Sequence, residues 1–588
     1  MTSGHIIVFA ILAAALALFV WGRWRYDVVA FAALMVGVIA GVVPTPDAFR
    51  GFGHPAVVTV AAVLVISRAL QNSGAIEHVA AFLGRTAERE LLHLVGLCVV
   101  AAFFSAFMNN VGALALLMPV AVQNARNPAT VLMPLSFGSI LGGLMTQIGT
   151  PPNIVIAVYR DKVAEAPFSL FDFSPVGVPL AVTGVAFVTL VGWRLLPKDR
   201  RGKRAPEELF EIKEYITEVQ VTEGSDAIDK ELREVEEAAE HDVTAIGLIR
   251  GDRRILSRVR HEPLRAGDVV ILQADPATVE KFVGAAGLEL VADEEISTKT
   301  LRSEDVSLAE VVVPRGAWIE GRTASSLHLR RRYGVNLLAL ARQGKPVRER
   351  LADTPIRAGD VLLLQGETET LFDTVSALGC LPLAERGLKL GGPRQLYLPV
   401  LVFLTAVGAT AMGIAPVHIS FGTAVAVLLL LNLVTARHAY EAIDWPVIVL
   451  LGAMIPLGQA LETSGGTDLI ARAIVGATGD VPLFLILALV MIVTMTLSDI
   501  MNNAATAVVM APIAARIAAE LGASADPFLM ATAIGASCAF LTPIGHQNNV
   551  LVMGPGGYRF GDYWRMGLPL EVLIVLLGVP LVMMVWPP

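Results

Sequence analysis

The most constraining feature of this chain is a motif that occurs twice in strongly apolar sequence. Residues 105–120 read SAFMNNVGALALLMPV, and residues 498–513 read SDIMNNAATAVVMAPI. Downstream of each copy, TQIGTPPN at 146–153 matches TPIGHQNN at 542–549. Because Asn, Gly and Pro interrupt apolar sequence at matching places, the pattern predicts two related halves built around one polar site.

The composition predicts that these repeats lie in a membrane. Apolar residues make up 54% of the 588 residues and charged residues 17%, with a mean hydropathy of +0.63. Such a chain is too apolar for an ordinary soluble protein, and the first apolar segment, at 5–20, is expected to be a transmembrane helix. The shorter apolar segments beside Asn-Asn or Gly-Pro are expected to form re-entrant hairpins or broken helices.

Basic residues predict the orientation of the chain. Arg23, Arg25, Arg85, Arg89 and the basic run at 198–204 mark the cytoplasmic side. The apolar segment that begins at Pro55 then runs inward, whereas its counterpart from Pro446 runs outward. The two halves are therefore expected to be inverted relative to one another, in the inner or plasma membrane of a cell.

A polar region separates the two halves and is itself duplicated. PLRAGDVVILQ at 263–273 matches PIRAGDVLLLQ at 355–365, and β-branched runs at 243–250 and 335–342 precede these turns. Each unit is predicted to hold short strands and a helix. The predicted fold class is a polytopic α-helical membrane protein with inverted repeats and re-entrant hairpins, interrupted by two small α+β cytoplasmic domains. The expected boundaries are 1–197, 206–293, 303–384 and 395–588.

The paired Asn residues are the candidate functional groups. Asn side chains donate and accept hydrogen bonds, and a helix N-terminus at a hairpin tip favours an anion. Unwound carbonyls and hydroxyls near such a tip are suitable ligands for Na⁺. Interhelical hydrogen bonding between Asn side chains is the structural alternative.

With these motifs, the chain resembles the divalent anion/sodium symporters, a citrate-transporter-like family of the ion-transporter superfamily. The resemblance covers both membrane halves and implies a homodimer that moves its substrate by an elevator-like shift. It also implies a secondary active, Na⁺-coupled symporter. The family's tips carry Ser-Asn-Thr, whereas this chain has Asn109-Asn110-Val111 and Asn502-Asn503-Ala504. The missing hydroxyls favour sulfate or a related oxyanion over a C4-dicarboxylate.

The resemblance also implies particular site residues. The first sodium site would be formed by Ser105, Asn110 and Gly149, and the second by Ser498, Asn503 and Gly545. The anion would contact Asn109, Asn110, Thr150, Asn502, Asn503 and His546. Two ionisable residues break the two-fold similarity. His546 is expected to bind the anion, to sense protons or to hydrogen-bond in its loop, and Asp499 to help hold a cation or to cap a hairpin helix.

The duplicated central modules resemble the C-terminal ligand-binding modules of potassium-conductance regulators, the RCK or TrkA type. That resemblance implies either a small regulatory ligand or bracing of a dimer. Other functions remain open: a C4-dicarboxylate or citrate symporter, a cation/proton antiporter supported by Asp499, and a ligand-gated channel suggested by the modules. The sequence has no nucleotide loop, metal motif or nucleophile elbow, so we expect no enzyme, tightly bound cofactor or nucleic-acid partner.

Overall fold

The computed structural model describes residues 3–21, 24–73, 89–125, 127–164, 166–197, 216–238, 244–251, 253–255, 261–273, 288–290, 306–343, 345–347, 351, 353–367, 370–383, 393–466 and 481–588. The orientation predicted from Arg23, from Arg85 and from the run at 198–204 rests on residues outside these ranges. The helix predicted after the first of the two RAGD strands lies outside them as well.

Helices occupy both ends of the chain. The helices before the polar centre are α1 (Ser3–Trp21), α2 (Tyr26–Ile39), α3 (Pro55–Asn72), α5 (Glu90–Ser105), α6 (Asn110–Asn124), α7 (Pro128–Gly142), α8 (Pro151–Ala164) and α9 (Ser174–Leu190). Those after it are α16 (Pro393–Ala411), α17 (Val417–Leu430), α18 (Ala436–Ala442), α19 (Trp445–Thr463), α21 (Leu483–Ile500), α22 (Asn503–Glu520), α23 (Ala525–Ser537), α24 (Gln547–Met553) and α25 (Tyr563–Val585). Short 3-10 turns are η1 (Thr45–Asp47), η2 (Arg50–Gly53), η3 (Gly143–Met145), η4 (Gly192–Leu195) and η8 (Phe560–Asp562).

The helical body has the composition of a membrane protein. Among the described residues, five helical stretches are long and apolar enough to cross a bilayer: Thr45–Asn72, Pro128–Met145, Trp445–Thr463, Leu483–Ile500 and Phe560–Val585. Large apolar side chains face outward, with Ile39 86%, Leu430 85% and Met584 77% exposed. Buried Asn, Ser and Thr side chains lie inside instead. Apolar outer surfaces and polar interior sites are what lipid requires of a polytopic helical protein.

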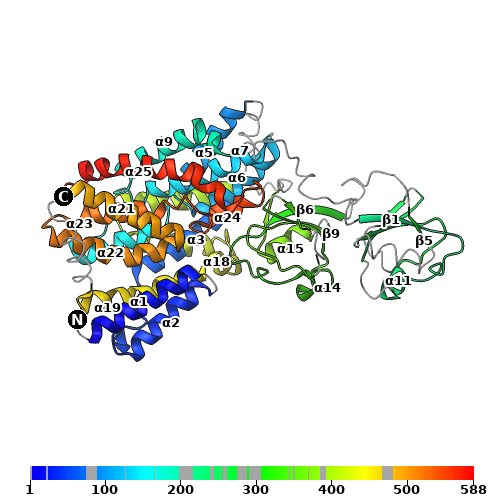
Figure 1. Ribbon diagram of the computed structural model, residues 1–588, viewed down its shortest axis with the longest axis horizontal. Helices are drawn as coiled ribbons and strands as arrows, with labels where there is room; N and C mark the ends of the chain where they lie inside the picture. The colour runs from blue at the N-terminus through cyan, green and yellow to red at the C-terminus, as the bar shows by residue number, and fades with distance from the viewer. Residues whose placement is uncertain are drawn as a thin grey trace.

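Helices from the two ends of the chain interlock. The helix α8 packs against α22 and α23, α24 packs against α7, and α25 packs against α9. Arg160 of α8 forms a two-pronged ion pair with Asp526 of α23, with both nitrogen–oxygen distances at 2.8 Å. The two ends of the chain therefore form one helical body rather than two bundles side by side (Figure 1).

The polar centre folds into two antiparallel sheets with the same strand order. The first contains β1 (Ile216–Val221), β2 (Thr244–Arg250), β3 (Arg253–Ile255), β4 (Val269–Gln273) and β5 (Leu288–Leu290), beside α11 (Leu232–Ala238). The second contains β6 (Val306–Val312), β7 (Asn336–Arg342), β8 (Lys345–Pro346), β9 (Val361–Glu367) and β10 (Leu381–Pro382), with α13 (Ala324–Leu327), α14 (Leu329–Tyr333) and α15 (Leu371–Ala377). The order β3-β2-β4-β1-β5 corresponds to β8-β7-β9-β6-β10.

Each sheet is closed by the same side-chain network at its RAGD turn. Arg250 donates to both carboxylate oxygens of Asp268 at 2.9 and 2.7 Å, and Arg342 donates likewise to Asp360 at 2.8 Å. The turn glycines have positive φ angles, +85° for Gly267 and +83° for Gly359, a conformation that glycine adopts without strain. The strands predicted on either side of the turns are confirmed, because local sequence specifies the turn and its partners.

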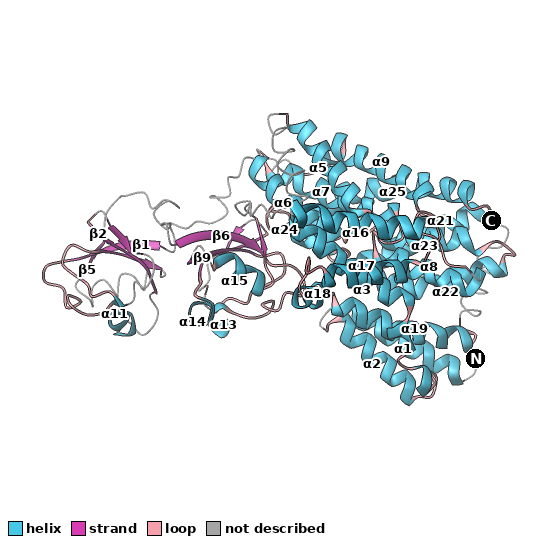
Figure 2. Cartoon of the chain, turned by 180° about the vertical axis from the view of Figure 1, so that it is seen from behind, coloured by secondary structure: helices cyan, strands magenta, loops and turns pink. Residues whose placement is uncertain are grey.

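The second sheet lies next to the helices, and the first lies beyond it (Figure 2). The guanidinium of Arg315, which follows β6, donates to the backbone carbonyl of Ile544 at 3.1 Å. The RAGD turn of the second sheet contacts α24, because a Cβ placed on Gly554 would lie 2.0 Å from the carbonyl oxygen of Gly359. The second sheet is thus in direct contact with the loop and short helix that carry the TPIGHQNN motif.

Candidate functional site

Each Asn-Asn pair ends one helix and begins the next. Asn109 is the N-cap of α6, and its side-chain oxygen accepts the backbone N–H of Val111 at 3.2 Å. Asn502 is the N-cap of α22 and accepts the N–H of Ala504 at 2.9 Å. Asn is among the strongest N-cap residues because its side chain satisfies backbone donors that the helix leaves free. The pairs α5–α6 and α21–α22 are therefore helical hairpins with tips at Asn109 and Asn502.

The second Asn of each pair is held by a serine five residues earlier. The Ser105 hydroxyl donates to the Asn110 side-chain oxygen at 2.6 Å, and the Ser498 hydroxyl donates to that of Asn503 at 2.9 Å. Ser139 of α7 adds a contact in the first half, donating to the Asn110 backbone carbonyl at 2.8 Å. The repeat thus places a hydroxyl, a side-chain amide and backbone carbonyls together twice, and these are oxygen ligands suited to a small hard cation.

Broken helices pass beside both tips. After α7 the chain unwinds over 146–150 before α8, and after α23 it unwinds over 538–546 before α24. Asn153 donates to the freed carbonyls of Gly143 and Thr146 at 3.1 and 2.9 Å. Its counterpart Asn549 donates to those of Ala539 and Thr542 at 3.1 and 3.2 Å. These bonds satisfy backbone groups that lipid would leave without partners.

Glycines allow the unwound loops to approach the tips. A Cβ on Gly149 would lie 2.6 Å from the carbonyl oxygen of Gly143, and one on Gly143 would lie 2.7 Å from the side-chain oxygen of Asn110. In the second half, a Cβ on Gly545 would lie 2.9 Å from the carbonyl oxygen of Ser498. Any larger residue would push the loop away from the hairpin, so glycine is required there.

The two halves meet at the first tip. His546 Nε2 lies 3.1 Å from the side-chain nitrogen of Asn110, and Asn548 donates to the backbone carbonyl of Asn110 at 3.3 Å. Ser136 of α7 donates to the side-chain oxygen of Asn549 at 2.8 Å. Residues more than 400 positions apart in the chain are therefore neighbours, and Asn110 takes part in two of these contacts.

His546 lies between a donor of its own loop and a donor of the first tip. Nδ1 lies 3.1 Å from the backbone nitrogen of Asn548 and accepts its N–H. Nε2 faces the side-chain nitrogen of Asn110, which also only donates. The ring therefore links the TPIGHQNN loop to Asn110.

The structure brings together most of the predicted site residues. Ser105, Asn110 and Gly149 lie around the first tip, and Ser498, Asn503 and Gly545 around the second. Asn109 and Asn502 use their oxygens as helix caps, which leaves their amide nitrogens for other partners. Thr150 is buried directly before α8. The sequence did not identify Ser136, Ser139 or Asn548 as site residues. It did signal the two asparagines whose side-chain amides bind the unwound loops, because Asn153 recurs as Asn549.

One interpretation is wrong. Asp499 does not cap a hairpin helix, because it lies in the last turn of α21 and the N-cap of α22 is Asn502. Its carboxylate instead accepts the backbone N–H of Leu541 at 3.0 Å, in the loop that follows α23. Asp499 lies before the break between α21 and α22, so its side chain faces the loop after α23 and not the N-terminus of α22. The sequence alone does not show on which side of the break a residue lies.

Comparison with known proteins identifies relatives of this chain among membrane transporters. The family described as "Citrate transporter" matches residues 16–535 and 488–587. An uncharacterized transporter of Synechocystis is 30% identical and aligns over 99% of this chain and 97% of its own length. The uncharacterized transporter YfbS of Escherichia coli is 29% identical over the full length of both chains. A "Probable sodium/sulfate cotransporter 3" of Chlamydomonas reinhardtii is 21% identical over 91% of this chain and 83% of its own.

The predicted family relationship is confirmed by these matches, whereas the relationship of the two sheets to potassium-conductance regulators stays a prediction. The repeated hairpin tips, the broken helices beside them and the full-length similarity to transporters lead to one conclusion: the chain belongs to the citrate-transporter family of membrane transport proteins.

Proposed function

We propose that this protein is a secondary active transporter that carries a small divalent anion together with Na⁺. The observation that carries this proposal is the repeated Ser–Asn pair, Ser105–Asn110 and Ser498–Asn503, each beside an unwound, glycine-containing loop. Hydroxyl, amide and carbonyl oxygens at two equivalent places suit two Na⁺ ions. The name of the sodium/sulfate relative supports Na⁺ as the coupling ion.

The anion site is proposed between the tips, at the N-termini of α6 and α22. Free backbone donors and the helix dipole favour negative charge there. The donors proposed for this site are the amide nitrogens of Asn109, Asn502 and Asn503 and the Thr150 hydroxyl, with the ring of His546 beside Asn110. These groups are neutral, so bound Na⁺ would supply the positive charge that offsets a divalent anion. Anion and cation binding would then be mutually dependent.

Sulfate or a related compact oxyanion is the proposed substrate. Val111 and Ala504 follow the tip asparagines where the symporter family carries a hydroxyl, so each tip offers one donor fewer for an extended dicarboxylate. An oxyanion whose charge is concentrated in a small volume needs fewer, more convergent donors. The sodium/sulfate relative supports this choice, and a C4-dicarboxylate or citrate is the alternative that the uptake experiment below separates.

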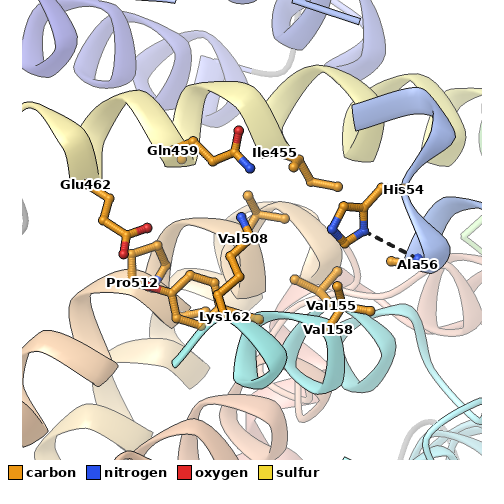
Figure 3. Close-up of a pocket in the computed structure, with 13 residues that line it drawn as sticks. His54, Ala56, Val155, Val158, Lys162, Ile455, Gln459, Glu462, Val508 and Pro512 are labelled. Carbon is orange, nitrogen blue, oxygen red and sulfur yellow. Dashed lines mark hydrogen bonds between the residues drawn. The ribbon is translucent and has the colours of Figure 1, made fainter. Parts of the chain in front are cut away.

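We further propose an elevator-type movement, with inverted halves of 1–197 and 395–588. A pocket lies between α3 and α19 on one side and α8 and α22 on the other (Figure 3). His54, Ile455 and Gln459 approach it from the first side, and Val155 and Val508 from the second. Incomplete packing along this seam supports sliding of one helix group past the other.

The two sheets, at 206–293 and 303–384, are proposed to be cytoplasmic modules that regulate transport or brace a homodimer. The contacts of Arg315 with Ile544 and of Gly359 with Gly554 support a regulatory role, since both reach the loop and helix that carry His546. A small ligand that changed the position of the second sheet would thereby change the position of the site.

The test is uptake of radiolabelled sulfate into proteoliposomes, with and without an inward Na⁺ gradient, with labelled succinate in parallel. We expect sulfate uptake that depends on the Na⁺ gradient and is competed by excess unlabelled sulfate. Uptake of succinate alone would retain Na⁺-coupled anion transport and overturn sulfate as substrate. Sulfate uptake that ignores the Na⁺ gradient would overturn Na⁺ coupling. Empty liposomes and the Asn110→Ala, Asn503→Ala double variant are the controls.

A further inference from the structure

A tyrosine from the second half of the chain bonds to the helix that carries Ser136 and Ser139. Tyr558 lies in the GPGGY turn at 554–558, directly after α24, and is fully buried. Its hydroxyl donates to the backbone carbonyl of Ala129 at 2.5 Å and accepts the backbone N–H of Met133 at 2.9 Å. One side chain of the second half therefore holds the beginning of α7 from outside that helix.

The two backbone groups that Tyr558 binds are the donor and the acceptor of one helical turn. Met133 follows Ala129 by four residues, which is the spacing of the α-helical hydrogen bond. Pro134, the next residue, has no N–H and so adds no bond to the helix. A side chain inserted among the backbone hydrogen bonds and a proline are each recognised causes of a bend in a helix. The course of α7 beyond this point therefore depends on where the Tyr558 hydroxyl lies.

The residues just beyond this point contact the site. Ser136 donates to the side-chain oxygen of Asn549 at 2.8 Å, and Ser139 donates to the backbone carbonyl of Asn110 at 2.8 Å. Both serines lie within about two turns of Met133 on the same helix. A shift of the beginning of α7 would therefore move Ser139 relative to the first tip.

The connection continues in the other direction to the second sheet. Tyr558 donates its backbone N–H to the carbonyl of Met553, the last residue of α24, at 2.9 Å. Gly359 of the RAGD turn lies against the same end of α24. A Cβ placed on Gly359 would be 3.3 Å from the methyl carbon of Met553 and 3.1 Å from the carbonyl oxygen of Val550. The sheet, the end of α24 and Tyr558 are thus in continuous contact.

A second tyrosine fixes the ring of Tyr558 to α24. The rings of Tyr558 and Tyr563 pack edge to face, with their centroids 5.9 Å apart, and the Tyr563 hydroxyl donates to the backbone carbonyl of Asn549 at 2.6 Å. A Cβ on Gly556 would lie 2.2 Å from the ring of Tyr558, so glycine allows the ring to fold back over its own turn. We therefore expect α24 and the GPGGY turn to move as one unit.

We propose that Tyr558 is a positioning residue for the first cation site and the route by which the second sheet regulates that site. When the sheet shifts α24, the Tyr558 hydroxyl shifts the beginning of α7, and Ser139 moves relative to Asn110. Coupling of this kind is carried by packed side chains and hydrogen bonds that join rigid elements. This inference rests on the proposed transport function and adds to it which site the sheet regulates and through which side chain.

The first experiment measures sulfate uptake by the full-length protein in liposomes against Na⁺ concentration. Tyr558→Phe keeps the ring and removes the hydroxyl. We expect its apparent Na⁺ constant to rise about 10-fold, the effect of one lost hydrogen-bonding group, with the maximal rate at saturating Na⁺ retained. A lower maximal rate with an unchanged Na⁺ constant is the result of a merely structural role and would overturn the proposal.

Combined variants test the connection to the sheet. Gly359→Ala should change the Na⁺ constant when Tyr558 is present and have no further effect in the Tyr558→Phe background, because the route is already interrupted. Gly267→Ala, at the matching turn of the first sheet, should leave the Na⁺ constant unchanged in both backgrounds. Independent sites have additive effects. Additive effects of Gly359→Ala and Tyr558→Phe would therefore show that the sheet acts by another route and would overturn the proposal.

Hydrogen exchange tests the same route without transport. In the purified full-length protein, Gly359→Ala should speed amide exchange across residues 130–139 by about 10-fold, through easier local opening of α7, and Gly267→Ala should not. In the Tyr558→Phe background, Gly359→Ala should cause no further change. Exchange in α7 that ignores Gly359→Ala would overturn the route even if Na⁺-driven sulfate uptake is found. The expected exchange without any uptake would retain the route and overturn the proposed function. Size-exclusion profiles of the variants establish that they fold.

Discussion

At the scale of single residues, Asn110 is contacted from both halves of the chain. It is held by Ser105 and Ser139 from its own half and contacted by His546 and Asn548 from the other. Asn503, by contrast, is held by Ser498 and remains partly accessible. Both tips therefore pair a serine hydroxyl with an asparagine. The first tip is also contacted by residues of the other half, whereas the second is more accessible.

The serine behind the second tip should control Na⁺ affinity. Its hydroxyl lies 2.9 Å from the Asn503 oxygen and 2.6 Å from the carbonyl oxygen of Ala536, so Ser498→Ala removes a ligand and releases the amide. We expect the apparent Na⁺ constant of sulfate uptake to rise by about 10-fold, corresponding to the loss of one hydrogen-bonding group. The measurement is initial uptake rate against Na⁺ concentration.

Ser420→Ala is the matched control, because Ser420 is also a buried serine on a helix and donates to the backbone carbonyl of Ala415. It should leave the Na⁺ constant unchanged. An unchanged constant in Ser498→Ala, with uptake intact, would remove this serine from the cation site.

At the scale of elements, both RAGD turns hold an arginine of their own sheet, and the turn of the second sheet also contacts α24. Both turn glycines have positive φ, and both aspartates hold an arginine of the neighbouring strand. Only the turn of the second sheet also touches α24: a Cβ on Gly359 would lie 3.1 Å from the carbonyl oxygen of Val550, whereas one on Gly267 meets nothing within 4 Å. A substitution at Gly267 is therefore a matched control for the same substitution at Gly359.

Gly359→Ala and Gly267→Ala should differ in their effect on transport. Both introduce a side chain into the left-handed region and should destabilise their sheet by about 1–2 kcal/mol. Only Gly359→Ala also pushes against α24, so only it should change the rate of uptake, by several-fold in either direction. Uptake kinetics and the melting temperatures of the two variants check this. Equal effects on uptake would show that the contact with α24 is not used in transport.

At the scale of the whole molecule, the seam between α3–α19 and α8–α22 is the surface along which movement is proposed. Ile455 of α19 and Val508 of α22 lie across the pocket from one another (Figure 3). The described cysteines, Cys98, Cys380 and Cys538, are buried. In the second sheet, burial raises the pKa of the Cys380 thiol to about 12, so at pH 8 little of it is thiolate and it reacts slowly.

Cross-linking across the seam should stop transport. With Ile455→Cys and Val508→Cys, a thiol-bridging reagent should reduce uptake to the background of empty liposomes, because the helix groups could no longer slide. Val155→Cys with Val508→Cys is the control: α8 and α22 pack together on one side of the seam, so bridging them should leave most uptake. Full uptake after a complete cross-link between Ile455→Cys and Val508→Cys would rule out sliding along this seam.

The sequence alone determined where the helices break and where the strands of the sheets form. These features depend on local signals, such as Asn at an N-cap, Gly at a positive φ and the alternation or continuity of apolar residues. Duplication strengthened each signal, because the same residues recur in both copies at Asn109 and Asn502 or at Gly267 and Gly359. The family was visible from those motifs for the same reason.

The tertiary structure alone decided which of these features are neighbours. Nothing in the RAGD turn predicts its contact with α24. The contacts of His546 with Asn548 and Asn110 likewise appear only when the chain is folded. Such contacts join segments that are distant in sequence. They depend on how apolar helices pack, and packing preferences between apolar helices are too similar to be read from composition.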